Sequence, residues 1–290
     1  MAITASMVKE LRERTGAGMM ECKKVLTQTD GDMEAAIEEL RIKGAAAAEK
    51  KAGRIAAEGV IVSAGSRDSG ALVEINCETD FVAKDDSFKA FSASVANTVL
   101  ATSPADNQAL ASAELASGGT VESARQELIA KIGENVSLRR FVKLDAEGGC
   151  VSTYLHGNRI GVMVKLEGGN DQLGRDIAMH IAASNPLSIS EEEMDQDVLA
   201  REKDIFIAQA KESGKPDDII EKMIGGRIKK FLKENTLLGQ PFVKNPDQTV
   251  AELLNDKGAK VTQMVRFEVG EGIEKREDDF VAEVMAQANA

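Results

Sequence analysis

The side chains that usually carry acid–base or nucleophilic chemistry are scarce in this chain of 290 residues. It has two histidines, His156 and His180. His156 stands in a turn-forming His-Gly-Asn-Arg stretch, whereas His180 lies on the apolar side of a predicted helix, where a buried structural histidine is the usual outcome. An enzyme that uses His156 with a carboxylate is kept as an alternative, and it requires a closed pocket around His156.

Metal, thiol and nucleotide chemistry are supported no better. The three cysteines lie tens of residues apart, which fits neither a disulfide framework nor a zinc site. Acidic residues such as Asp85 and Asp86 stand at predicted helix starts, where they stabilise the helix dipole. The stretch Gly16–Gly18 begins like a dinucleotide-binding motif, but Glu21 occupies the position of its third glycine. By elimination, the sequence favours a protein that acts by binding.

The overall composition excludes further classes of partner. The chain carries 36 basic and 48 acidic residues, and its net charge of −12 opposes binding to nucleic acid or to an anionic membrane. It has nine Phe, one Tyr and no Trp, so base-stacking surfaces and aromatic pockets for flat cofactors are not expected. Charged residues interrupt the N-terminal stretch before a signal peptide could form. We therefore expect a cytoplasmic protein that binds another protein and needs no metal or cofactor.

The N-terminal pattern predicts three short helices between residues 4 and 44, the last of them ending at Gly44. Met19 and Met20 stand at the start of the second helix, beside a loop that contains two glycines. Such a small unit cannot bury every apolar side chain, so these methionines are either exposed for a partner or part of the core. Residues 45–57 are rich in alanine and are expected to form a tether or a loose helix.

A β-hairpin followed by a helix is predicted twice. Around residues 58–100, alternating hydrophobic residues flank a Gly-Ser-Arg-Asp-Ser-Gly turn, and a helix begins near Asp86. The same order recurs around residues 136–184, which predicts an internal duplication. The first copy has an additional segment, 77–85, between its strand and its helix. Extra length that carries Phe81 beside a carboxylate is typical of a functional loop.

Two long charged helices are predicted in residues 190–234, broken once at 213–216, and they would form an antiparallel hairpin. Their apolar stripe is expected to join the two arms, with pairing between two copies of the chain as the alternative. A strand, a helix and a strand follow, at 240–243, 250–254 and 260–269. The last predicted helix is amphipathic and suits docking to a partner. Its apolar residues are Phe280, Val281, Val284 and Met285.

Six stretches, spread in order over almost the whole chain, carry recognisable motifs. They are Leu11–Lys24, Thr79–Lys84, Lys131–Asn135, His156–Gly161, Gly239–Val243 and Arg266–Gly272. Each motif alone is of modest specificity, but their joint order is highly specific. In these stretches the sequence resembles the bacterial elongation factor Ts family, the guanine-nucleotide exchange factors of elongation factor Tu.

The resemblance implies an α+β multidomain fold. Its expected parts are an N-terminal three-helix, ubiquitin-associated-like domain, two duplicated core subdomains, an inserted coiled-coil hairpin and a C-terminal helix module. In this sequence the corresponding ranges are 1–54 for the N-terminal domain, 55–140 for the first core subdomain, 141–188 with 235–269 for the second, 189–234 for the hairpin and 270–290 for the C-terminal module.

The resemblance also implies a mechanism and its residues. Members of the family bind elongation factor Tu in its GDP-bound and nucleotide-free states and release GDP by disturbing the Mg²⁺ and phosphate site of that partner. The exchange motif would be Thr79, Asp80, Phe81 and Val82. Further partner contacts would be Met19, Met20, Lys23, Ile132 and His156. A homodimer or a 2:2 complex through the hairpin is a further expectation. Without the resemblance, Phe81 would be expected to fold onto the core as a residue of a helix.

A different kind of binding protein is the main alternative. An adaptor would use its small helical domain to recruit a helical or ubiquitin-like partner and its hairpin to dimerise. This hypothesis predicts that the exchange motif is dispensable and that the N-terminal module suffices for binding.

Overall fold

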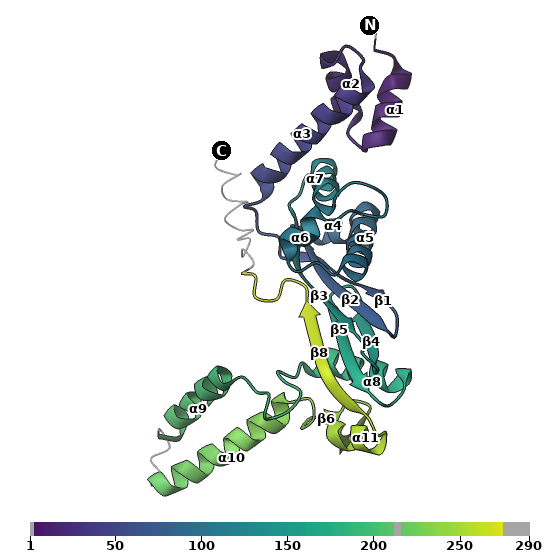
Figure 1. Ribbon diagram of the computed structural model, residues 1–290. Helices are drawn as coiled ribbons and strands as arrows, with labels where there is room; N and C mark the ends of the chain where they lie inside the picture. Colours follow the sequence, from purple (N-terminus) through teal and green to yellow (C-terminus); the bar gives the residue numbers. More distant parts are fainter. Residues whose placement is uncertain (1–2, 212–215, 275–290) are drawn as a thin grey trace. The chain divides into compact units, whose positions relative to one another are not determined.

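The computed structural model describes residues 3–211 and 216–274, and Figure 1 shows the order of their helices and strands. The described chain is a mixed α+β protein. It divides into two compact units. The first runs up to Val62 and adds Val73–Phe141 and the segment from Glu268, whereas the second contains Ser63–Leu72 and Val142–Phe267.

The first unit begins with three helices, which confirms the predicted order. They are α1 (Ala5–Thr15), α2 (Met19–Gln28) and α3 (Met33–Lys51). Gly16 ends α1, because its φ of 68° lies in the left-handed region that glycine adopts without strain. The three helices enclose a small apolar core, whose buried members are Val8, Leu11, Cys22, Val25, Leu26 and Ala36.

The prediction that the third helix ends at Gly44 is wrong. The helix α3 continues to Lys51, since the alanines that follow Gly44 have high helix propensity. Gly44 is buried, and a Cβ atom built on it would lie 3.7 Å from the Gln126 carbonyl oxygen of the neighbouring helix α7 (Val121–Ile132). A Cβ at this distance would make an ordinary van der Waals contact, so Gly44 is a buried residue inside a helix that packs on α7 and not a helix end, and residues 45–51 are helical.

Most residues of a three-stranded sheet in the order β1-β2-β3 also belong to the first unit. Its strands are β1 (Glu58–Gly65), β2 (Ser69–Cys77) and β3 (Val136–Asp145). In chain order, four helices follow β2 and precede β3. They are α4 (Asp80–Lys84), α5 (Asp86–Thr102), α6 (Asn107–Ser112) and α7. The first predicted order of hairpin and helix is confirmed by β1, β2 and α5.

The assignment of residues 136–145 to the second copy of the repeat is wrong. These residues form β3, which is hydrogen-bonded beside β2 in the first sheet. Local hydrophobic alternation predicts that a strand exists, but it does not specify which distant strand will be its neighbour.

The second unit is built on a sheet in the order β4-β5-β8. Its strands are β4 (Cys150–His156), β5 (Ile160–Glu167) and β8 (Lys260–Glu268). The antiparallel pairing of β4 with β5 puts His156 opposite Ile160, which confirms the second predicted hairpin. Helix α8 (Asp171–Ser184) contacts both of these strands and shares their apolar core.

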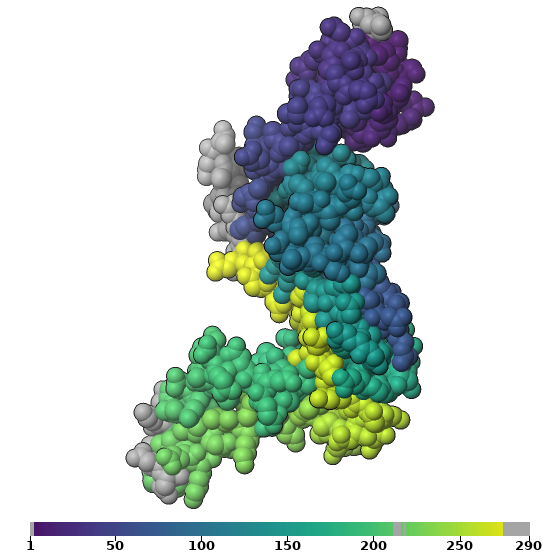
Figure 2. Space-filling model, viewed as in Figure 1, coloured from purple at the N-terminus to yellow at the C-terminus, as the bar shows by residue number. Residues whose placement is uncertain are grey.

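The predicted helical hairpin consists of α9 (Gln196–Lys211) and α10 (Asp217–Asn235), which lie side by side in Figures 1 and 2. The rings of Phe206 and Phe231 meet edge to face with centroids 6.4 Å apart, so the two arms contact each other. The expected helical start at residue 190 is wrong. The Asp195 carboxylate accepts a 2.7 Å hydrogen bond from the Asp197 N–H and thereby caps α9.

The C-terminal part of the second unit contains β6 (Pro241–Phe242), β7 (Asn245–Thr249) and α11 (Val250–Asp256). The strand near 240–243, the helix at 250–254 and the strand at 260–269 are thereby confirmed, whereas β7 was not expected from its polar sequence. The predicted helix at 280–285 and the hairpin break at 213–215 lie outside the described residues. Among residues 3–211 and 216–274, every helix is too short or too polar to traverse a membrane.

Candidate functional site

The stretch Thr79–Val82 covers the N-cap and the first residues of the short helix α4, which follows β2 and precedes α5. Thr79 is the N-cap of α4, and its hydroxyl oxygen accepts a hydrogen bond from the Val82 N–H at 3.4 Å. Val82 is buried and fixes one side of α4 to the unit. At the far end, the Asp85 carboxylate accepts hydrogen bonds from the first N–H groups of α5, and the Phe88 N–H is the main cause of its lowered pKa. Two caps therefore delimit this segment.

Phe81 is on the outward side of α4 and is 80% exposed. The Lys84 ammonium lies 6.0 Å from the centre of its ring and also pairs with the Asp80 carboxylate at 2.6 Å. The default expectation that Phe81 packs onto the core is therefore wrong. An exposed aromatic ring on a fixed helix is an apolar contact point, and a neighbouring charged pair keeps its surroundings polar.

The loop after α7 meets this segment directly. Ile132 ends α7 and is half-buried, and two residues later the Glu134 carboxylate accepts a hydrogen bond from the Thr79 hydroxyl at 2.7 Å. The structure thus places the predicted contact Ile132 at the end of the helix whose following loop holds Thr79 of the predicted exchange motif. Glu134 was not predicted to act, although it belongs to the Lys131–Asn135 motif, because sequence spacing cannot show which distant loop a carboxylate will face.

The predicted contacts of the N-terminal module are exposed together on α2. Met19 is 57% and Met20 is 77% exposed, so the alternative that both methionines belong to the core is wrong. Lys23 is also exposed, one turn further along the helix, whereas Cys22 between them is buried. The start of α2 therefore presents two flexible apolar side chains and one cation on a single surface.

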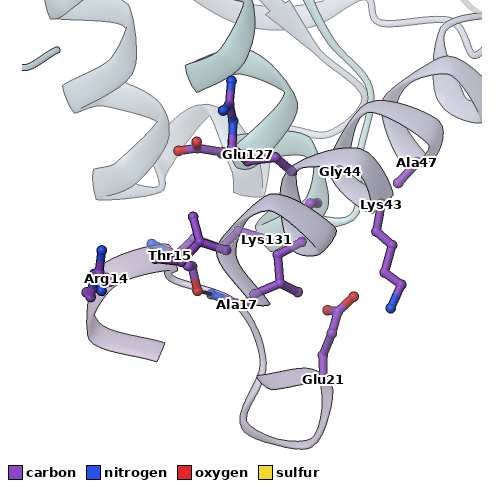
Figure 3. Close-up of a pocket in the computed structure, with 13 residues that line it drawn as sticks. Arg14, Thr15, Ala17, Glu21, Lys43, Gly44, Ala47, Glu127 and Lys131 are labelled. Carbon is purple, nitrogen blue, oxygen red and sulfur yellow. Dashed lines mark hydrogen bonds between the residues drawn. The ribbon is translucent and has the colours of Figure 1, made fainter. Parts of the chain in front are cut away.

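A groove of about 150 Å³ lies between this module and α7, and Figure 3 shows the side chains that line it. Gly44 and Ala47 of α3 form one wall, and Glu127 and Lys131 of α7 form another. The Lys131 ammonium donates a 2.7 Å hydrogen bond to the Ser87 hydroxyl and so is already partnered. None of the predicted contact residues lines this groove, so it is distinct from the predicted partner surface.

The two histidines have different surroundings in the second unit. His156 is exposed at the end of β4, with its Nδ1 atom 3.2 Å from the Tyr154 hydroxyl. The closed pocket that the enzyme hypothesis requires does not surround it. His180 is buried, its Nε2 atom lies 2.9 Å from the Gln240 side-chain oxygen, and its Nδ1 atom accepts the Val243 N–H at 3.2 Å. Burial lowers the pKa of His180, so this residue is a neutral structural histidine, as the sequence predicts.

The described residues offer little for covalent or metal chemistry. Burial, with the nearby Glu134 and Glu58 carboxylates, raises the pKa of the Cys77 thiol to about 12, so Cys77 is not a thiolate near neutral pH. In the parts of the chain that the structure describes, no three His, Cys, Asp or Glu side chains gather closely enough to hold a metal ion. What the surface does present is a set of exposed apolar side chains on fixed elements, which defines an interaction surface of a mixed α+β protein.

Comparison with known proteins identifies the family. Residues 78–271 match the family model described as elongation factor TS. The chain is 60% identical over 290 residues to elongation factor Ts of Alkalilimnicola ehrlichii and 62% identical over 291 residues to that of Thioalkalivibrio sulfidiphilus, with 99% of each chain covered. It is 59% identical over 292 residues to elongation factor Ts of Methylococcus capsulatus, with complete coverage of both. The chain belongs to the elongation factor Ts family.

Proposed function

We propose that the chain is the guanine-nucleotide exchange factor of elongation factor Tu, and that it promotes GDP release by binding alone. The observation that carries the proposal is the exposed ring of Phe81 on the fixed helix α4. The name that its relatives share, and their identity of 59–62% along the whole chain, support the choice of partner.

In this proposal Phe81 acts as an apolar wedge. Mg²⁺ requires a nearly ideal octahedral shell and bridges phosphate oxygens to protein ligands, so a small shift of the partner's supporting loop would cost coordination and weaken GDP binding. Burying one phenylalanine ring against the partner stabilises the complex by about 1.5–3 kcal/mol. This is too little to displace a tightly bound nucleotide unless other contacts hold the wedge in place.

The proposed holding contacts are the other exposed residues. Met19 and Met20 would pack against an apolar surface of the partner, and Lys23 would meet an acidic group there. Ile132 would contribute beside the wedge, and His156 would hydrogen-bond or pack on a second surface. Because free-energy coupling is reciprocal, a factor that weakens nucleotide binding must itself be bound less tightly once nucleotide is present, so incoming GTP expels it.

The exchange proposal is tested by the release of a fluorescent GDP analogue from elongation factor Tu. The wild-type chain should accelerate release, and Phe81→Ala should be about 10- to 100-fold slower, the range that corresponds to the buried ring. Ile42→Ala is the matched control, because Ile42 is also a large exposed apolar residue and is 58% exposed on α3. If the wild type binds elongation factor Tu without accelerating release, the exchange proposal fails and the adaptor hypothesis is favoured. If Phe81→Ala is as fast as the wild type, the wedge role fails.

The hairpin supports two assemblies. Contact between Phe206 and Phe231 joins the arms of one chain, while Ile205 and Ile219 are exposed. In this proposal each of these isoleucines would contribute an apolar contact to a second copy of the chain. A homodimer, and a 2:2 complex with elongation factor Tu, therefore stay predictions.

A further inference from the structure

Two loops of the first unit are joined by a crossed pair of glutamates at the base of α4. The Glu134 carboxylate, in the loop between α7 and β3, accepts the Glu78 N–H at 3.1 Å and the Thr79 N–H at 3.0 Å through one oxygen. Its second oxygen accepts the Thr79 hydroxyl at 2.7 Å. One charged acceptor therefore fixes both the backbone and the side chain of Thr79, immediately before α4.

The second glutamate, Glu78, lies in the segment before α4 and binds the loop that contains Glu134. The Glu78 carboxylate accepts the Asn135 N–H at 2.6 Å and pairs with the Arg54 guanidinium at 3.4 Å. Asn135 is buried, and its side-chain amide donates to the Arg54 carbonyl oxygen at 2.9 Å. The loop that holds α4 is thus itself held by the segment that follows α3.

These contacts matter because α4 is too short to be stable by itself. It has five residues, whereas isolated helices shorter than about 12–15 residues are marginal in water. The Thr79 hydroxyl donates to Glu134 and at the same time accepts the Val82 N–H, so the cap of α4 is continuous with the Glu134 contact. Phe81 is 80% exposed and has little packing of its own, so the direction of its ring depends on the backbone of α4.

We propose that Glu134 is a positioning residue for nucleotide exchange, one that holds Thr79 and thereby presents Phe81 in the orientation that the partner requires. This inference rests on the proposed exchange function. The benefit is preorganisation: without Glu134, the ordering of α4 would have to take place in the complex and would subtract from the free energy available to displace the nucleotide.

Three substitutions at Glu134 separate positioning from charge. Glu134→Ala removes every acceptor. Glu134→Asp keeps the charge but is one methylene shorter and cannot reach all three donors. Glu134→Gln loses the charge, but its amide oxygen can accept both N–H groups while its amide nitrogen donates to the Thr79 hydroxyl. Positioning therefore predicts that Gln restores activity and that Asp does not.

The measurement is release of the fluorescent GDP analogue from elongation factor Tu over a range of concentrations of the full-length variants. Glu134→Ala and Glu134→Asp should lower the maximal release rate about tenfold, because one hydrogen bond to a charged acceptor changes an equilibrium by about this factor or more. The concentration of the variant that gives half the maximal rate should change less than about twofold, since the other proposed contacts, such as Met19 and Met20, are unchanged. Glu134→Gln should stay within about threefold of the wild type.

A double-mutant cycle tests whether Glu134 acts through Phe81. The combination of Glu134→Ala with Phe81→Ala should be no slower than Phe81→Ala alone, because a wedge that is absent cannot be misplaced. Glu127→Ala is the matched control, since Glu127 is an exposed glutamate on α7, the helix that precedes the same loop. It should release GDP like the wild type. Thermal unfolding by circular dichroism identifies any variant that fails to fold.

The outcomes distinguish this inference from the function on which it rests. If the wild type does not accelerate release, the exchange function itself fails. If the wild type is active and folded Glu134→Ala has the same maximal rate, positioning is refuted. Positioning is also refuted if the effects of Glu134→Ala and Phe81→Ala on the release rate multiply in the double variant. The same holds if folded Glu134→Gln is as slow as Glu134→Ala. Where Glu134→Ala does not fold, the comparison of Glu134→Gln with Glu134→Asp decides the question.

Discussion

Glu74 is the residue whose removal should most clearly reveal how the first unit is held together. Its side chain is fully buried in β2. The carboxylate accepts hydrogen bonds from Arg139 at 2.8 Å and from Arg140 at 2.6 Å, both on β3. It also accepts the Gly270 N–H at 2.8 Å, which attaches the segment after β8 to the same group. One buried charge therefore connects three parts of the chain.

We predict that Glu74→Gln lowers the free energy of unfolding by about 3 kcal/mol. Removing one partner of a buried ion pair costs about 3–5 kcal/mol where the remaining charge is left without compensation. The lower end applies here for two reasons. The Arg139 and Arg140 side chains are 23% and 31% exposed, so water can partly solvate them, and Arg140 keeps its ion pair with the Glu271 carboxylate at 3.0 Å. The neutral amide also presents a donor to two cationic donors, so isosteric replacement does not restore the network.

Urea unfolding followed by circular dichroism measures this change, and amide hydrogen exchange at Gly270 reports whether the attached segment is released. Glu38→Gln is the control, because Glu38 pairs with Arg41 on the surface and its side chain is 61% exposed. The control should change the unfolding free energy by less than about 0.5 kcal/mol. If Glu74→Gln is as stable as the control and Gly270 keeps its protection, then the buried network does not hold the segment and the reasoning is wrong.

Two further predictions concern the second unit. Burial lowers the pKa of His180 below its ordinary value of 6.5, so the unfolded chain binds the proton more readily than the folded chain. The stability that neutral His180 contributes is therefore complete above about pH 6.5. It is lost as the pH falls through the lower pKa of the folded state. The urea concentration at the unfolding midpoint should therefore decrease as the pH is lowered from about 7 to about 5, and His180→Gln should make this decrease smaller. If His180→Gln has the same pH dependence as the wild type, the prediction is wrong. Gly174→Ala should lower the free energy of unfolding by about 1–3 kcal/mol, because the new Cβ would lie 2.1 Å from the Ser152 hydroxyl oxygen. Ser152→Gly should relieve that clash, and an equal loss in both backgrounds would show that the contact is not its cause.

Much of the local structure could be predicted from the sequence because its signals are local. The αL glycine at Gly16 and the period of apolar residues before it define the end of α1. The turn after His156 defines the hairpin of β4 and β5, since the residues that form it adjoin both strands. The same logic fails at Gly44, a residue type that usually ends helices, because the helix-forming alanines that follow it continue α3 to Lys51.

The candidate site could be predicted only in part. Only the family resemblance points to Thr79–Val82 as a functional motif, and the pattern of residues alone predicts burial of Phe81. Exposure of that ring depends on how the short helix α4 is attached, which no local pattern encodes. Glu134 illustrates the same limit: it stands more than fifty positions after Thr79, yet its carboxylate lies 2.7 Å from the Thr79 hydroxyl.

The sequence by itself determined the secondary structure of most segments and the family to which the chain is similar. These follow from residue types and short spacings, which act over a few positions of the backbone. Only the tertiary structure decided that β3 joins the first sheet, that Met19, Met20 and Phe81 are exposed, and that the Glu134 carboxylate lies beside Thr79. The physical reason is that burial and hydrogen bonding between distant segments depend on the packing of the whole unit, where each side chain competes with all others for the same space.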